Sequence, residues 1–409
     1  MRTFLKAALI GSTLGFAVGC QTYDFQRVDP LAVSQTKQSK SVVAKNLKPN
    51  MMLLVDKSGS MNLPTDPGNS NCPANCGGSQ LCPSNCPTRI SELKSAMNGF
   101  LNQYGNVARF GLAFYPAMSD VCAGTPVNGA AENLPNPSST DPVVGAMSEY
   151  QLKANAINMK IQAVTPGGGT PTGESLKNVG QLAGLRDGAD LRDDFIVLLT
   201  DGLPNCNPNN VTNSCAGVSA ACICTIGGAS SCSGQFCAKG CLDRTGVVEK
   251  VQDLRTAGIR TIVVGFGADT AAGDAPATLN AMAAAGGFAR TCPNGTDTEC
   301  GTGNACVQST KVCRSQFYQA ANGMELGKAL ADISNIISGD TICKFTLDAQ
   351  PTDPKLLAVT VNGVSQPQGD DTWRFEDAKV VFKGAQCAAL QGATPNAPVN
   401  VEIRIVETL

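Results

Sequence analysis

The sequence predicts an α/β fold, a doubly wound and mostly parallel sheet with disulfide-rich insertions, followed by a small C-terminal β domain. Strand-like and helix-like segments alternate between residues 48 and 340, as they do where helices join parallel strands. The segment Phe195–Thr200 is almost wholly apolar, which is typical of a strand buried on both faces. Most of the 19 cysteines fall between these segments, which indicates crosslinked loops rather than additional core.

The alternating region is assigned segment by segment from its periodicity. Short apolar runs predict strands at 53–55, 108–115, 195–200, 260–265 and 317–319. Helices are predicted where apolar residues recur every three or four positions, as at Ile90, Leu93 and Met97. The expected helices are 90–104, 149–163, 173–183, 245–257, 276–285 and 323–337.

Three insertions and a terminal domain complete the expected organisation. Gly, Ser, Asn, Pro and Cys dominate the insertions at 62–88, 203–243 and 292–313, so these must depend on crosslinks. The first two insertions should surround the carboxyl edge of the sheet, as stabilising loops or as a surface that reads a partner. Alternating apolar residues at 356–361 and 399–406 predict a sandwich-like β domain over 341–409, with Trp373 in its core.

Oxygen-bearing side chains follow two of the predicted strands. Asp56, Ser58 and Ser60 follow the first strand, and Asp201 follows the apolar strand that ends at Thr200. Thr170 lies in a loop rich in glycine and proline, where Thr172 is an alternative ligand. The carboxyl ends of parallel strands are where such folds bind ligands, and carboxylates with hydroxyls suit Mg²⁺, Mn²⁺ or Ca²⁺.

These three pieces, D-x-S-x-S, the threonine loop and T-D-G, resemble the von Willebrand factor A (vWA) family over residues 48–340. The resemblance implies a metal-ion-dependent adhesion site with Asp56, Ser58, Ser60, Thr170 and Asp201 as ligands. It implies a divalent cation, Mg²⁺ first and Mn²⁺ or Ca²⁺ otherwise, with an open position that accepts a partner's acidic group. The alternative is a domain that keeps the fold and has lost the metal.

The first 20 residues are typical of an export signal. Arg2 and Lys6 precede an apolar stretch that is too short to span a bilayer, and small residues then precede Cys20. This pattern resembles a bacterial lipoprotein signal, which implies lipidation of Cys20 and, with Gln21 next, an outer-membrane lipoprotein. An ordinary secretory signal is the alternative. Residues 21–47 are interpreted as a flexible tether with a reach on the order of 30 Å.

The cysteine count supports export. Lipidation of Cys20 leaves 18 cysteines, an even number for disulfides in an oxidising compartment. The group at 206–241 is odd by itself, so Cys122 is predicted to bond into it, and Cys343 is predicted to pair with Cys387. Zinc bound at Cys72, Cys76, Cys82 and Cys86 is the rival interpretation.

Composition excludes several function classes. A net charge of −2 with 16% charged residues argues against nucleic-acid binding. The chain has no histidine, which removes Ser-His-Asp catalysis and most catalytic zinc sites. We therefore do not expect an enzyme.

The sequence thus predicts an envelope lipoprotein that binds a protein or an anionic glycan through a cation, in adhesion, motility or envelope assembly. A scaffold stabilised by the metal and a metal-dependent envelope hydrolase are the alternatives. Asp269 and Asp274 are either supporting acids or a surface loop. Lys57 and the acids at 190, 193 and 194 are expected to be solvated.

Overall fold

The computed structural model describes residues 37–42, 44–45, 48–117, 122, 149–186, 192–207, 210, 222–225, 232, 239–347, 349–391 and 399–408. The predicted signal segment 1–20 with Cys20, tether residues 21–36 and Asp190 lie outside the described residues. None of the helices in the described part of the chain is both long and apolar enough to cross a membrane.

A five-stranded parallel sheet forms the centre of the larger of two compact units. Its order is β4-β3-β5-β6-β9, and every neighbouring pair is parallel. The inner strand β3 is fully buried, as expected for a strand covered on both faces. The bounds are β3 Asn50–Asp56, β4 Arg109–Tyr115, β5 Asp194–Thr200, β6 Ile259–Phe266 and β9 Tyr318–Ala320.

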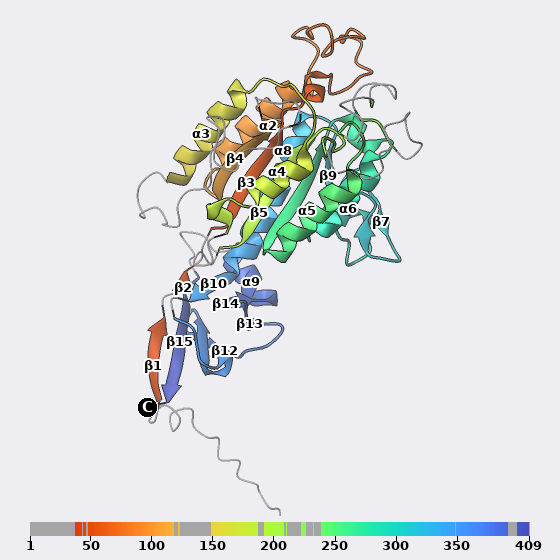
Figure 1. Ribbon diagram of the computed structural model, residues 1–409. Coiled ribbons are helices and arrows are strands. Elements are labelled where there is room, and N and C mark those ends of the chain that lie inside the picture. Colours follow the sequence, from red (N-terminus) through yellow and green to blue (C-terminus); the bar gives the residue numbers. More distant parts are fainter. Residues whose placement is uncertain are drawn as a thin grey trace, which may run out of the picture. The chain divides into compact units, whose positions relative to one another are not determined.

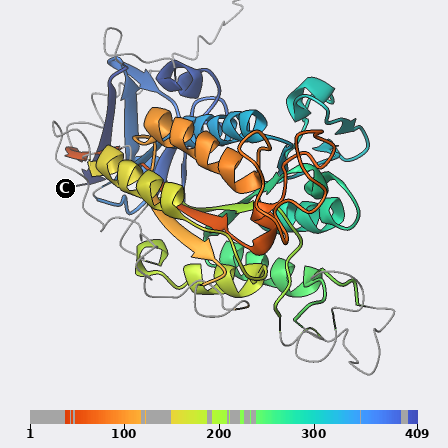
Figure 2. The ribbon, with the colours of Figure 1, turned by 90° about the horizontal axis from the view of Figure 1, so that it is seen from above.

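Alternate side chains of β3 enter two separate cores, one on each face of the sheet. Met51, Leu53 and Val55 pack in the first core, whereas Met52 and Leu54 pack in the second. Three helices supply the first core and three the second, on opposite sides of the sheet (Figures 1 and 2). The first set is α2 Arg89–Tyr104, α3 Glu149–Ala163 and α8 Gly323–Ile342; the second is α4 Thr172–Val179, α5 Arg244–Thr256 and α6 Ala275–Ala285. The predicted doubly wound fold is confirmed.

Two helices differ from their predicted lengths. The helix expected at 173–183 ends at Val179, and a 3₁₀ turn, η2 Ala183–Leu185, follows it. The last helix continues beyond residue 337 to Ile342, so it reaches directly to Cys343. The remaining short elements are η1 Gly59–Asn62, η5 Ala268–Ala271, α7 Asp297–Cys300, β7 Cys306–Val307 and β8 Val312–Cys313.

The C-terminal strands, together with two strands from residues 37–45, form two antiparallel four-stranded sheets, which belong to different compact units. The sheet β13-β14-β10-β2 is part of the larger unit, with α9 Gly384–Gln391 after β14. The sheet β1-β15-β11-β12 belongs to the smaller unit, with η6 Pro354–Leu356 before β11. The strands are β1 Lys37–Val42, β2 Ala44–Lys45, β10 Lys344–Leu347, β11 Leu357–Val361, β12 Val364–Gln366, β13 Trp373–Glu376, β14 Lys379–Phe382 and β15 Val401–Thr408.

This arrangement differs from the expected boundaries at 47 and 341. Residues 37–42, predicted as tether, form β1 and pair with β15 from Lys37↔Thr408 to Val42↔Ile403. Their polar sequence gave no strand signal, because an edge strand is held by backbone hydrogen bonds rather than by apolar side chains. The expected single domain over 341–409 is divided, since β10, β13 and β14 belong to the larger unit. Trp373 is buried as expected, with 1% of its surface exposed.

Asp193, expected to be solvated, lies instead in an ion cluster at the amino end of β5. Its carboxylate lies 3.0 Å from Lys379 Nζ, 3.4 Å from Lys344 Nζ and 4.0 Å from Arg260 Nη2, and its side chain is 22% exposed. The two lysines come from β14 and β10, so the cluster ties that sheet to the parallel sheet. The neighbouring Asp194 accepts a hydrogen bond from Asn50 Nδ2 (2.7 Å).

The Asp193 cluster should make stability depend on pH. Although burial by itself raises the pKa of Asp193, Lys379, Lys344 and Arg260 outweigh it and lower the pKa below its usual value. The ionised carboxylate therefore stabilises the fold at neutral pH, and this contribution is lost as the pH falls below about 4, through the lowered pKa. Asp193→Asn should cost about 1–3 kcal/mol at pH 7, and the difference from wild type should shrink in acid.

Urea unfolding between pH 3 and pH 7 measures this effect. Asp253→Asn is the matched control, because Asp253 pairs with Lys250 on the surface with 70% of its side chain exposed. An equal, pH-independent loss in both variants would contradict the assignment.

Candidate metal centre

The two candidate carboxylates lie at the ends of neighbouring strands. Asp56 is the last residue of β3, and Asp201 directly follows β5, which pairs with β3 up to Val55↔Leu199. Parallel strands in this register end at the same edge, which brings the two acids together. Both side chains are fully buried, with 0% of their surface exposed.

The loop after β3 connects these carboxylates through its serines. The Ser58 N–H donates to Asp56 Oδ1 (2.8 Å), and the Ser58 and Ser60 hydroxyl oxygens lie 2.9 Å apart. The Ser60 hydroxyl then donates to Asp201 Oδ1 (2.9 Å). Four of the predicted ligand residues are therefore linked in one hydrogen-bonded chain.

Thr170 joins this group through the backbone of its loop. The Gly59 N–H donates to the Gly168 carbonyl (2.9 Å), and the Gly167 N–H donates to the Lys57 carbonyl (2.7 Å). Thr170 itself is 5% exposed. The alternative ligand, Thr172, begins α4 and directs its hydroxyl to the Thr170 carbonyl (3.4 Å), which favours Thr170 as the ligand.

Three residues that sequence reasoning missed hold the candidate ligands. Asn205 clamps Thr170 with two hydrogen bonds. The Asn205 side-chain Oδ1 accepts from the Thr170 N–H (2.8 Å), and the Asn205 backbone N–H donates to the Thr170 carbonyl (2.9 Å). The Thr200 hydroxyl donates to Asp56 Oδ2 (2.9 Å). Arg89, the first residue of α2, donates from Nη1 to Asp201 Oδ2 (2.8 Å). Thr200 stands beside Asp201 and could have been suspected, but no local pattern marks Arg89 or Asn205.

Two acids of the β6–α6 loop, left open by the sequence, take different roles. Asp269 pairs with Nη2 of Arg89 and so supports the centre indirectly. Asp274 pairs instead with Arg244 (3.0 Å). Lys57 was expected to be solvated, but it is only 3% exposed, and its carbonyl accepts a hydrogen bond from the Gly167 N–H.

Burial gives the two carboxylates unusual electrostatics. Desolvation, and secondly the neighbouring Asp201, raise the pKa of Asp56 to about 7. Desolvation also raises the pKa of Asp201, although Arg89 opposes it. Burial, with the Asp56 charge, raises the pKa of Tyr115 well above its usual value.

These groups fit a hard divalent cation. Within the described ranges Asp201 has Arg89 as its cationic partner, whereas no lysine or arginine forms an ion pair with Asp56. A buried carboxylate without a positive partner is costly, and a bound cation would remove that cost. Two carboxylates with serine and threonine hydroxyls are the donor set that Mg²⁺, Mn²⁺ and Ca²⁺ accept.

The cysteines form disulfides rather than a thiolate metal site in the described residues. Three groups have sulfurs close enough for a metal, but every one of these cysteines is bonded to another. This disfavours zinc at 72–86, where the pairs are Cys72–Cys86 and Cys76–Cys82. The other described pairs are Cys122–Cys206, Cys222–Cys241, Cys224–Cys232, Cys292–Cys306, Cys300–Cys313 and Cys343–Cys387.

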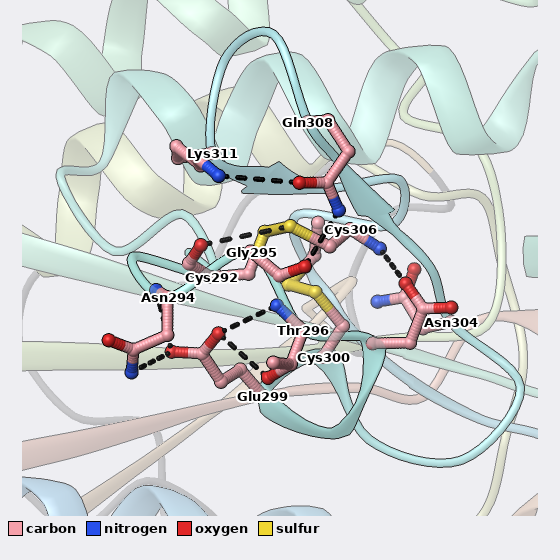
Figure 3. The surroundings of a disulfide bond; sticks show 12 residues. Cys292, Asn294, Gly295, Thr296, Glu299, Cys300, Asn304, Cys306, Gln308 and Lys311 are labelled. Atoms are coloured by element: carbon pink, nitrogen blue, oxygen red, sulfur yellow. Dashed lines mark hydrogen bonds between the residues drawn. A yellow bond between two sulfur atoms is a disulfide. The ribbon is translucent and has the colours of Figure 1, made fainter.

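The pairings expected for Cys122 and for Cys343 are both present. Cys122 is joined to Cys206, directly after Asn205, so a crosslink adjoins the residue that clamps Thr170. The third insertion, residues 292–313, is a small knot of two interleaved disulfides (Figure 3). In it the Glu299 carboxylate accepts hydrogen bonds from the backbone and side chains of Asn294 and Thr296.

Comparisons with known proteins give fold likenesses only. No protein-family model matches the sequence, and no curated protein matches it. The pilus adhesin SpaC from Lactobacillus rhamnosus GG is similar over 89% of this chain and 40% of its own length, at 12% identity and TM-score 0.40.

Two further solved structures contain similar folds. The PilB minor pilin from Streptococcus sanguinis matches 71% of this chain and 62% of its own length (16% identity, TM-score 0.40). Manganese-loaded Plasmodium vivax TRAP matches 57% of this chain and 61% of its own length (16% identity, TM-score 0.30). The chain thus spans less than two thirds of each of these proteins, and likenesses at this level assign it to no family.

Proposed function

We propose that this chain is an exported cell-envelope protein of the vWA type that binds a macromolecular partner through a divalent cation. Asp56, Ser58, Ser60, Thr170 and Asp201 hold the cation, Mg²⁺ first and Mn²⁺ or Ca²⁺ otherwise. The partner is a protein or an anionic glycan that supplies a carboxylate. The role is adhesion, motility or envelope assembly, and binding rather than catalysis.

One observation carries this proposal: the hydrogen-bonded chain from Asp56 through Ser58 and Ser60 to Asp201 at the carboxyl edge of the sheet. The loops that bear the candidate ligands carry small residues at several positions that reach solvent. Gly59, Ser60 and Gly202 are partly exposed, and Gly168 is exposed. Side chains of this size obstruct the approach of an acidic group from solvent less than large side chains would.

The chemistry required of the chain is binding and orientation. A bound divalent cation supplies the positive charge that attracts a carboxylate, and exclusion of water by the rim strengthens that attraction. Asn205 fixes the Thr170 loop, and Thr200 fixes Asp56 Oδ2, so the donor set is held before binding. A set held in advance loses little conformational entropy when the site is used.

Affinity capture from native envelope fractions tests the proposal. The exported protein should capture an envelope component in Mg²⁺ or Mn²⁺, and EDTA should abolish the capture. Asp274→Asn is the matched control, since this acid lies on the β6–α6 loop and pairs with Arg244 outside the ligand cluster. Capture that persists unchanged in EDTA would refute a cation-dependent contact.

A scaffold stabilised by the metal is the second candidate, favoured by the complete burial of Asp56 and Asp201. A cation bound between two buried carboxylates stabilises the folded state whether or not a partner ever reaches it. The two functions separate in one pair of measurements. If EDTA lowers the melting temperature and leaves capture unchanged, the scaffold is correct.

The proposed location in the outer membrane is inferred from the sequence. Lipidation of Cys20 would anchor the protein in the outer membrane, and the following polar residues would separate the cation site from the lipid. Labelling with a fatty-acid analogue in the native host should mark the wild type and should fail in Cys20→Ala. Labelling of both proteins would exclude Cys20 as the anchor.

A further inference from the structure

Arg89 is a buried cation in direct contact with a candidate metal ligand. Its side chain is 2% exposed, and Nη1 donates to Asp201 Oδ2 (2.8 Å). Nη2 pairs with Asp269, whose side chain is 60% exposed. The guanidinium therefore bridges a ligand of the centre and an acid at the protein surface.

The surrounding backbone fixes Arg89 in this position. A Cβ atom on Gly267 would lie 3.1 Å from Nε and 3.4 Å from Cδ of Arg89, so this glycine packs closely against the side chain. Gly267 has φ of 92°, a conformation that other residues rarely adopt. Nε is buried and has no hydrogen-bond partner among the described residues, so both bonds of Arg89 to acids are made by its Nη atoms.

Arg89 makes the two carboxylates of the centre unequal. Asp201 directs Oδ1 to the Ser60 hydroxyl and Oδ2 to Arg89. Asp56 receives only neutral donors in the described contacts, the Ser58 N–H and the Thr200 hydroxyl. One of the two negative charges is therefore already balanced by the protein before any cation binds.

We propose that Arg89 sets the net charge of this centre. Its positive charge lowers the affinity for the cation and raises the affinity of the loaded site for an acidic partner. The inference rests on the proposed function. Replacing Arg89 by a neutral residue would remove one positive charge from the site, so the site would bind a divalent cation more tightly. The same loss would leave less net positive charge on the loaded site to attract a carboxylate.

The role of Asp269 predicts a change of opposite sign. This acid partly screens Arg89, so its removal exposes the site to more of the guanidinium charge. Asp269→Asn should therefore weaken cation binding and strengthen the attraction for an acid. Its exposure to water makes the effect smaller than that of Arg89.

The experiment compares Arg89→Gln, Arg89→Lys and Asp269→Asn with the wild-type full-length protein. Calorimetric titration with Mn²⁺ alone gives the cation affinity. A labelled tetraglutamate peptide, with its tetraglutamine counterpart as blank, gives the affinity of the Mn²⁺-saturated protein for an acid. Circular dichroism melts check folding.

Arg89→Gln should bind Mn²⁺ about tenfold more tightly and tetraglutamate about tenfold more weakly. Arg89→Lys should stay close to wild type, because it keeps the charge. Asp269→Asn should bind Mn²⁺ about two- to threefold more weakly and tetraglutamate correspondingly more tightly. A merely structural role for Arg89 would instead reduce both affinities, and that result would overturn the proposal.

Each remaining outcome also supports or overturns the proposed role of Arg89. If Arg89→Gln does not fold, Asp269→Asn carries the test, and an unchanged Mn²⁺ affinity in that variant overturns the proposal. If the wild type binds Mn²⁺ but neither it nor any variant binds tetraglutamate, the proposed capture of acids is wrong. A Mn²⁺ affinity that depends on Arg89 would still support the charge-setting role in that case. A wild type that binds no Mn²⁺ overturns both.

Discussion

Asp56→Asn should abolish the stabilisation of this protein by Mg²⁺ or Mn²⁺ and, at the same time, make the cation-free protein more stable. In wild type a cation at 100 times its dissociation constant should add about 2.7 kcal/mol to the free energy of unfolding. Asparagine removes the one candidate carboxylate that has no cationic partner in the described residues, so this gain should disappear.

The cation-free gain has the same origin. Asp56 is a fully buried acid, and the charged form of such a group is costly without a partner. An amide of the same shape still accepts the Ser58 N–H, and the Thr200 hydroxyl also bonds to Gly202, so little is lost with the charge. We expect Asp56→Asn to gain about 1–3 kcal/mol in EDTA at neutral pH.

In EDTA, Asp56→Asn should therefore melt at a higher temperature than the wild type, and Mg²⁺ should raise the melting temperature of the wild type but not that of the variant. Asp274→Asn serves as the control, because its ion pair with Arg244 lies outside the ligand cluster. An Asp56→Asn protein that keeps the full cation-induced shift would show that the cation binds elsewhere.

Breaking Cys122–Cys206 should cause the largest loss of stability of any single crosslink in the described residues. The bond joins residues 84 positions apart, the largest separation among the described disulfides. The chain-entropy relation gives about 4.5 kcal/mol for a loop of this length. Cys122→Ser with Cys206→Ser should lower the free energy of unfolding by about that amount.

The same double variant should also lose cation affinity. Cys206 follows Asn205, whose backbone and side chain both bond to Thr170. Without the crosslink this clamp is held less firmly, and the Thr170 loop must be ordered when a cation binds. Asn205→Ala should reproduce the loss of Mn²⁺ affinity with a smaller loss of stability.

The knot at 292–313 supplies the matched control. Cys300→Ser with Cys313→Ser removes a bond of separation 13, which corresponds to about 3 kcal/mol, without touching the ligand loops. Urea unfolding and Mn²⁺ titration of both double variants decide the matter. If both lose Mn²⁺ affinity equally, the coupling of Cys206 to Thr170 is wrong.

The candidate centre shows where prediction from sequence succeeds. Asp56 and Asp201 could be placed together because each follows an apolar strand, and parallel strands end at a common edge. Arg89 could not be found in this way, since 112 residues separate it from Asp201 and no local pattern relates the two. Asn205 was likewise hidden, because it lies within a cysteine-rich insertion without periodicity.

The periphery shows where such prediction fails. The polar strand β1 carries no hydrophobic alternation, and only its pairing with β15 makes it a strand. Asp193 resembled a solvated turn residue until Lys344 and Lys379, far along the chain, were placed beside it. In both cases the structure depends on a contact between distant segments.

The sequence by itself determined the order of strands and helices, the two buried faces of the sheet and the loops that bear the candidate ligands. These properties follow from the spacing of apolar residues along short segments, which local chemistry sets. Only the tertiary structure decided which positively charged side chain balances Asp201, which residue holds Thr170 and how the N-terminal strands pair. Those contacts depend on how helices and loops pack around the sheet, and the spacing of residues within a segment does not encode that packing.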